Sequence, residues 1–167
     1  SFVEYRINNE GELLVRGKVI ARYVIKDGAV IANDDWFNTK DLAECKNGHY
    51  LILGRRDDVV ISSAGENVNP NLLEPHFKDI AGVDGVCIIG GKQNGETVPI
   101  LLVSINKHTT KERFEQIDAE IKERINAINA AQLLRKVIYV TASLIQGQEF
   151  KLNRTRIRAD YENGSFP

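Results

Sequence analysis

The chain has 167 residues, with 22 basic and 23 acidic side chains and a formal net charge of −1. This length suits one domain, or one small domain with an appendage, and it is enough to bury a hydrophobic core. The balanced charge argues against nucleic acid as a partner, because nucleic-acid-binding domains carry a clear excess of Lys and Arg.

The sequence shows no membrane-spanning run and no signal peptide. Its two cysteines, Cys45 and Cys87, follow no metal-ligand spacing, and Cys87 lies in an apolar run typical of a buried core. We therefore expect a reduced, cytoplasmic protein. Because the chain begins at Ser1 and contains no Met, we also expect it to be part of a longer protein.

The first third of the sequence predicts antiparallel β structure. Four short apolar runs are bounded by glycine, by Asp27-Gly28 or by Asn47-Gly48, and the two dipeptides are hairpin turn signals. These runs are residues 11–17, 19–25, 29–32 and 49–53. We interpret residues 1–54 as strands of a sheet whose remainder lies outside this sequence.

A strand at 59–61 and a turn at 64–67 begin a second region. Asn69-Pro70 is typical of a helix start, with Asn as the N-cap and Pro in the first turn. Pro75 then predicts a kink or a delayed start, because proline has no backbone N–H to donate inside a helix. Gly82 is expected to end this helix.

The rest of the second region predicts two strands, a long helix, a third strand and a final basic helix. The predicted segments are strands 85–89, 98–105 and 137–140, a helix capped by Thr109-x-x-Glu112, and a helix over 154–161 capped by Asn153. This order indicates an α+β fold, a small domain with a three-stranded sheet, a β-hairpin and packed helices. Antiparallel strands from the end of a larger domain would precede it.

Four polar motifs stand between these elements. They are Thr39-Lys40-Asp41, Gly54-Arg55-Arg56-Asp57-Asp58, Ser62 to Pro70, and Phe150-Lys151-Leu152-Asn153-Arg154. Taken singly, each has an ordinary explanation: an Asp turn, a charged turn, a hairpin turn followed by an Asn cap, and a surface lysine.

Their order and spacing together resemble the domain junction and small C-terminal domain of the adenylate-forming enzymes, the acyl-CoA synthetase superfamily. The matching residues are Gly11-Glu12-Leu13, Arg16-Gly17, Trp36, Thr39, Asp41, Gly54-Arg55, Gly65 and Lys151. The resemblance implies that residues 1–54 end the large adenylation domain, that 55–58 form a hinge, and that 59–167 form the small C-terminal lid domain.

The resemblance assigns nucleotide binding to Asp41 and Arg55. The family motif that matches residues 39–41 is Thr-Gly-Asp, and its Asp accepts hydrogen bonds from the ribose hydroxyls of ATP or AMP. An ionised carboxylate suits this role because it only accepts hydrogen bonds. Lys40 departs from the family glycine, which affects how closely the backbone approaches the nucleotide. In the family, the Arg that matches Arg55 approaches the nucleotide in one state.

The resemblance also assigns the moving parts. Asp57 matches the pivot of the hinge, and Gly65 and Glu66 match a turn that enters the active site for the thioester step. Glycine there suits a close approach of backbone to ligand. A Gly-Glu-Asn-x-x-Pro run, with a bulky residue before Lys151, is similar to the long-chain fatty acid–CoA ligase branch.

Lys151 matches the catalytic lysine of the family, which binds the carboxylate and the α-phosphate during adenylation. The implied function is that of a ligase that uses ATP, Mg²⁺ and CoA to turn a fatty acid into acyl-AMP and then into acyl-CoA. All of these ligands would need the missing N-terminal adenylation domain. Since no Gly-rich phosphate loop is present, we expect this chain alone to be inactive.

Two alternatives remain open on the sequence. In the first, the acceptor would be a carrier-protein phosphopantetheine or an amine in place of CoA. Arg154, Arg156 and Arg158 would bind the phosphates of CoA if CoA is the acceptor, or an acidic carrier protein if it is not. In a different class, the chain would be a non-catalytic interaction module that keeps the fold.

Overall fold

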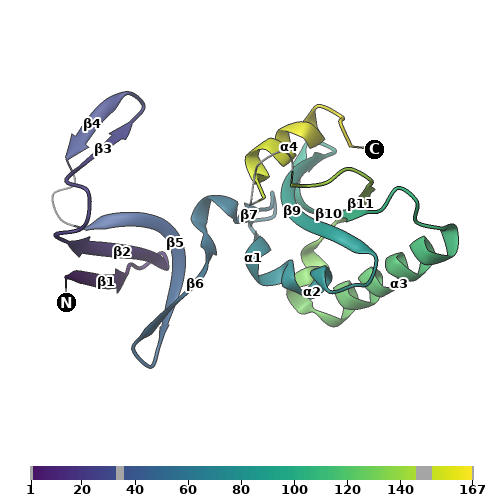
Figure 1. The fold of residues 1–167 in the computed structure, drawn as a ribbon, viewed down its shortest axis with the longest axis horizontal. Coiled ribbons are helices and arrows are strands. Elements are labelled where there is room, and N and C mark those ends of the chain that lie inside the picture. Colours follow the sequence, from purple (N-terminus) through teal and green to yellow (C-terminus); the bar gives the residue numbers. More distant parts are fainter. Residues whose placement is uncertain (1, 33–35, 146–151, 167) are drawn as a thin grey trace. The chain divides into compact units, whose positions relative to one another are not determined.

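The computed structural model describes residues 2–32, 36–145 and 152–166. The chain divides into two compact units, residues 1–57 and 58–167 (Figure 1). The assignment of residues 1–54 to a large domain and of 55–58 to a hinge stays a prediction.

Unit 1 contains a four-stranded antiparallel sheet with the strand order β1-β2-β5-β6, and a separate hairpin of β3 and β4. The strands are β1 (Val3–Ile7), β2 (Glu12–Gly17), β3 (Tyr23–Lys26), β4 (Ala29–Ala32), β5 (Phe37–Lys46) and β6 (His49–Arg55). Both Asp27 and Gly28 have positive φ angles, 52° and 78°, as a two-residue hairpin turn requires. The predicted hairpin is confirmed, although its first strand begins at Tyr23 rather than Val19.

Unit 1 has a small core. Leu13, Val15 and Ala43 are buried in one cluster, with Ile7 and Phe37 packed against it. Several large apolar side chains of the unit are exposed, among them Ile25, Val30, Leu51 and Ile52.

Unit 2 is built on a three-stranded sheet with the strand order β11-β10-β9, in which β9 and β10 are antiparallel and β10 and β11 are parallel. The strands are β9 (Val83–Gln93), β10 (Glu96–Ile105) and β11 (Lys136–Val140), and β7 (Val60–Ile61) pairs with β8 (Asn67–Val68) in a separate hairpin. The helices are α1 (Pro70–Leu73), α2 (Pro75–Lys78), α3 (Lys111–Ala127) and α4 (Arg154–Glu162), with short 3₁₀ turns η1 (Arg56–Asp58) and η2 (Asn129–Leu133).

Helices cover both faces of this sheet (Figure 1). Ile88 belongs to a core cluster with Phe77 of α2 and Ile117 of α3, whereas its neighbour Ile89 belongs to a second cluster with Ile157 of α4. Successive residues of a strand point to opposite faces, so a strand buried on both sides is a continuous apolar run. This explains the unbroken apolar runs at 86–91 within β9 and 98–103 within β10.

The helix boundaries confirm most of the local predictions. The predicted break at Pro75 is present, because α1 ends at Leu73 and Pro75 starts α2. Asn153 caps α4 as expected, accepting from the backbone N–H of Arg156. The capping box at Thr109 is wrong: Thr110 is the N-cap of α3 and accepts from the backbone N–H of Arg113.

The predicted α+β fold is confirmed, with a three-stranded sheet, hairpins and packed helices. In the described part of the chain, no helix is both long and apolar enough to cross a membrane.

Candidate functional site

Asp41 and Arg55, the two residues assigned to the nucleotide, lie directly opposite each other on β5 and β6. Arg55 Nη1 is 3.4 Å from Asp41 Oδ1, and the Asp41 side chain is 29% exposed. Arg55 Nη2 also lies 3.9 Å from a carboxylate oxygen of Asp57. Antiparallel pairing thus brings together two residues that are 14 positions apart in the sequence.

The strand bends beside Asp41. The pairing of β5 with β6 shifts register between Leu42 and Ala43, which is a bulge-type irregularity of the kind often found next to active sites. Lys40 has a φ angle of 63°, in the left-handed region that favours glycine. The position at which this sequence departs from the family glycine is therefore one whose backbone conformation glycine adopts without strain.

Glu12 is a buried residue of this site to which the resemblance assigned no role, although it lies in the matching Gly11-Glu12-Leu13 run. Its side chain is 2% exposed, and its carboxylate accepts from Asn38 Nδ2 at 2.7 Å, Asn8 Nδ2 at 3.0 Å and Lys40 Nζ at 3.3 Å. The hydrogen bonds from Asn38 and Asn8, together with the charge of Lys40, lower the pKa of Glu12 to about 2. Besides that match, the sequence shows an acidic residue at the start of an otherwise apolar strand.

The Gly65 turn joins β7 and β8 in unit 2. Gly65 has a φ angle of 81° and is exposed, and apart from Gly65 and its two chain neighbours none of the described residues has an atom within 4 Å of the place that a Cβ would occupy. Ser63 anchors the turn to β10, because its backbone N–H donates to Thr97 O and its Oγ accepts from Thr97 N. The base of the turn is therefore fixed to β10, and its tip at Gly65 is exposed to solvent.

The Glu66 carboxylate faces its own turn. Ser62 Oγ donates to Glu66 Oε2 at 3.3 Å, the backbone N–H of Glu66 donates to Ser62 Oγ at 3.1 Å, and Arg135 Nη2 lies 3.8 Å from the same carboxylate. These contacts give Glu66 a part in shaping the turn on which Gly65 lies.

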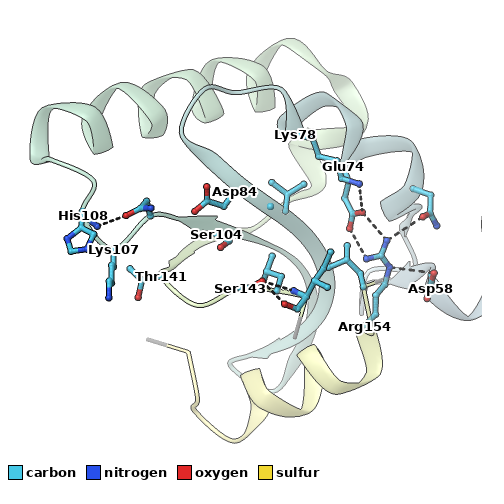
Figure 2. A pocket seen from close by; sticks show the side chains of 17 residues that line it. Asp58, Glu74, Lys78, Asp84, Ser104, Lys107, His108, Thr141, Ser143 and Arg154 are labelled. Atoms are coloured by element: carbon cyan, nitrogen blue, oxygen red, sulfur yellow. Dashed lines mark hydrogen bonds and ion pairs between the residues drawn. The ribbon is translucent and has the colours of Figure 1, made fainter. Parts of the chain in front are cut away.

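Lys151 falls outside the described residues. The segments on either side of it, up to Ile145 and from Leu152, border an open pocket of about 990 Å³ within unit 2 (Figure 2). The polar part of its wall includes Glu74, Asp84, Ser104, His108, Thr141 and Arg154.

Arg154 is held in a buried charge cluster at one wall of this pocket (Figure 2). Its side chain is 9% exposed, and its two terminal nitrogens lie 2.9 and 3.0 Å from the two oxygens of Glu74, whose side chain is 2% exposed. Arg154 Nε is 3.5 Å from Asp58 Oδ2. Glu74 also accepts from the backbone N–H of Ile88 at 2.8 Å. The cluster therefore ties Asp58, the junction of α1 and α2, β9 and α4 together.

This arrangement corrects the suggestion that Arg154 meets an external phosphate or an acidic carrier, because internal carboxylates already surround its guanidinium. Arg156 donates to Leu144 O at 3.0 Å and lies 3.8 Å from Asp160. Cys87, also beside Arg154, is buried, and its burial raises the pKa of the thiol to about 12. It is a neutral core residue, as predicted.

Among residues 2–32, 36–145 and 152–166, no group of three or more His, Cys, Asp or Glu side chains is arranged to hold a metal ion.

Comparison with known proteins gives the family. The sequence model of the family described as AMP-binding enzyme C-terminal domain matches residues 57–161. The chain belongs to this family. The match covers the whole charge cluster of unit 2, the Gly65 turn and the position of Lys151.

Two curated relatives extend the similarity into unit 1. A 2-succinylbenzoate–CoA ligase of Staphylococcus epidermidis is 32% identical over 174 residues, covering 95% of this chain and 34% of the relative. The long-chain-fatty-acid–CoA ligase FadD15 of Mycobacterium tuberculosis is 29% identical over 155 residues, covering 78% of this chain and 26% of the relative. The chain thus spans about a third or less of the length of these relatives.

Solved structures share the fold. The anthranilate CoA ligase AuaEII, in complex with anthranoyl-AMP, gives a TM-score of 0.71 at 19% identity over 99% of this chain and 34% of that protein. A Mycobacterium tuberculosis fatty acyl CoA synthetase gives a TM-score of 0.60 at 22% identity over 98% of this chain and 34% of that protein.

Proposed function

We propose that this chain is the C-terminal part of an ATP-dependent acid–CoA ligase, which activates a carboxylic acid as acyl-AMP and passes the acyl group to CoA. The observation that carries the proposal is the Asp41–Arg55 pair on adjacent strands, immediately before the segment that matches the family at 57–161. The similarity to a 2-succinylbenzoate–CoA ligase over 95% of the chain supports the same reaction class.

In the adenylation step, Asp41 would accept hydrogen bonds from the ribose hydroxyls. A carboxylate offers about four acceptor positions, so the single contact from Arg55 Nη1 leaves capacity for two hydroxyl donors. Lys151 would place a compact positive charge on the α-phosphate and the attacking carboxylate, where negative charge develops. Magnesium would accompany the ATP; no step here depends on a metal site in this chain.

In the thioester step, the Gly65 turn would line the path of the CoA thiol. Its open tip allows the backbone to approach a ligand closely, and the contacts from Ser63 to Thr97 hold it in shape. Asp57, whose side chain is 74% exposed, would act as the pivot between the two steps. The domain and hinge boundaries given above form part of this proposal.

For the acid, we propose a long-chain fatty acid, supported by the Gly65-Glu66-Asn67 run and by the similarity to FadD15. The similarity to 2-succinylbenzoate–CoA ligase, which covers more of the chain, favours an aromatic acid as the second candidate. The pocket for the acid would lie in the large domain.

The test is acid-dependent exchange of labelled pyrophosphate into ATP by the full-length ligase, with palmitate and 2-succinylbenzoate in parallel. Exchange that needs one of these acids, followed by its CoA thioester on addition of CoA, is expected. Transfer to a carrier protein or an amine, but not to CoA, would contradict the proposed acceptor. The 167-residue chain alone is expected to catalyse neither step.

A further inference from the structure

The Glu12 carboxylate is buried, and its burial costs free energy. A buried carboxylate is strongly destabilising unless hydrogen-bond donors and opposite charge surround it. Glu12 meets this condition with three side-chain donors, from Asn8, Asn38 and Lys40, and its own backbone N–H donates to Asn8 Oδ1 at 2.8 Å. Two of the three donors come from the segment that immediately precedes Asp41.

That segment, residues 38–40, is held on both sides. Asn38 donates its Nδ2 to Glu12 and accepts the backbone N–H of Lys40 on Oδ1 at 2.8 Å. Thr39 Oγ1 donates to Leu13 O at 3.0 Å and accepts the backbone N–H of Asp41 at 3.1 Å. Two of these hydrogen bonds join Asn38 and Thr39 to β2, and the other two hold the backbone N–H groups of Lys40 and Asp41.

We propose that Glu12 is a positioning residue for nucleotide binding: it clamps residues 38–40 onto β2 and thereby orients the Asp41 carboxylate toward the ribose hydroxyls. The inference rests on the proposed function, because it takes Asp41 as the ribose ligand. It adds a residue that touches no substrate and acts through Asn38 and Lys40.

The same clamp accounts for the lysine at position 40. A left-handed backbone disfavours any residue with a Cβ, by about 1–2 kcal/mol. Lys40 has this backbone, and its ammonium lies 3.3 Å from Glu12 Oε1 while the side chain stays half exposed. The ion pair thus adds a contact to the clamp that glycine cannot make.

The first test uses amide hydrogen exchange in this chain, without any nucleotide. Glu12→Gln keeps the size of the side chain but replaces one acceptor oxygen with a donor, which faces the Asn38 amide or the Lys40 ammonium. Exchange of the Lys40 and Asp41 amides is expected to accelerate at least about tenfold, while amides of β9 and β10 stay unchanged. Glu10→Gln, an exposed neighbour on the same turn, is the matched control and should change neither. Unchanged exchange in Glu12→Gln would overturn the clamp.

The second test uses the full-length ligase with ATP and with 2′,3′-dideoxy-ATP, which lacks both hydroxyls. Glu12→Gln is expected to raise the KM for ATP about tenfold, the cost of weakening one hydrogen bond to a charged group, and to leave the KM for the dideoxy nucleotide unchanged. Asp41→Asn should behave in the same way, and the double variant should be no worse than Asp41→Asn alone.

The outcomes separate the two proposals. Equal losses with both nucleotides in Glu12→Gln would overturn the positioning role while leaving Asp41 as a ligand. No difference between the nucleotides in Asp41→Asn would overturn Asp41 as the ribose ligand, and with it the inference, even if the exchange result still shows the clamp. Should Glu12→Gln fail to fold, Asn38→Ala removes the 2.7 Å donor to Glu12 together with the Oδ1 that accepts the Lys40 N–H, and it carries the same prediction for ATP against the dideoxy nucleotide.

Discussion

Glu12 in unit 1 and Glu74 in unit 2 are equally buried, at 2% exposure, but they are satisfied in different ways. Glu12 accepts from two neutral amide side chains and one half-exposed ammonium. Glu74 faces the guanidinium of Arg154 through both oxygens and accepts a backbone N–H from Ile88. The first arrangement fixes a short segment beside a predicted ligand residue, whereas the second cross-links the body of the small domain.

A buried carboxylate can therefore either orient a neighbouring segment or hold several elements of a domain together. Amide donors impose direction without neutralising the charge, so Glu12 stays ionised and its pKa falls to about 2. A bidentate guanidinium provides both charge and direction, but either partner is costly to leave alone. We therefore expect loss of stability to dominate in unit 2 and loss of local order to dominate in unit 1.

Breaking the unit 2 cluster should have the largest effect. Arg154→Ala leaves the Glu74 carboxylate buried without its main partner, which costs about 3–5 kcal/mol of unfolding free energy. Urea unfolding followed by circular dichroism measures this loss. Lys111→Ala removes an exposed lysine whose Nζ lies 3.9 Å from Glu115 and should cost less than about 0.5 kcal/mol. Similar losses in the two variants would contradict the importance given to burial.

Glu12→Gln should cost less than Arg154→Ala, and its effect should depend on pH. The pKa of Glu12 is lower in the folded chain than its ordinary value of 4.5, so the folded state binds this proton less readily than the unfolded state. The stabilisation is complete above about pH 5 and is lost as the pH falls toward 2. The stability difference between the native chain and Glu12→Gln should therefore shrink from about pH 5 to about pH 3; a constant difference would count against an ionised Glu12.

The smallest effect is expected at Lys40. Lys40→Gly and Lys40→Ala both lose the contact with Glu12, and they differ in whether a Cβ stands on the left-handed backbone. Lys40→Gly should therefore be more stable than Lys40→Ala by about 1 kcal/mol, measured by thermal unfolding. Equal stability would mean that the φ angle at this position carries no strain.

The features predicted correctly from the sequence are local ones. The Asp27-Gly28 hairpin, the break at Pro75 and the cap at Asn153 depend on residues within one turn of the feature itself. The cap of α3 was misplaced by one residue, because Thr109 and Thr110 both carry a hydroxyl that can accept from the first turn.

The clusters around Glu12 and Glu74 could not be predicted in the same way. Asn38 lies 26 residues from Glu12, and Arg154 lies 80 residues from Glu74, so only the folded sheets bring the partners together. A carboxylate in a sequence gives no sign of whether it will be buried or of which donors will reach it. The ribose and α-phosphate roles of Asp41 and Lys151 rest on family resemblance and stay predictions.

The most direct test of the central claim is to measure the two half-reactions of the full-length ligase separately in Lys151→Ala, with Lys111→Ala as the control. The account predicts that Lys151→Ala slows acyl-AMP formation at least about a hundredfold, the scale of losing a charge that stabilises the transition state. It should leave the reaction of preformed acyl-AMP with CoA close to the native rate. Equal loss in both half-reactions, or no loss in either, would contradict the account.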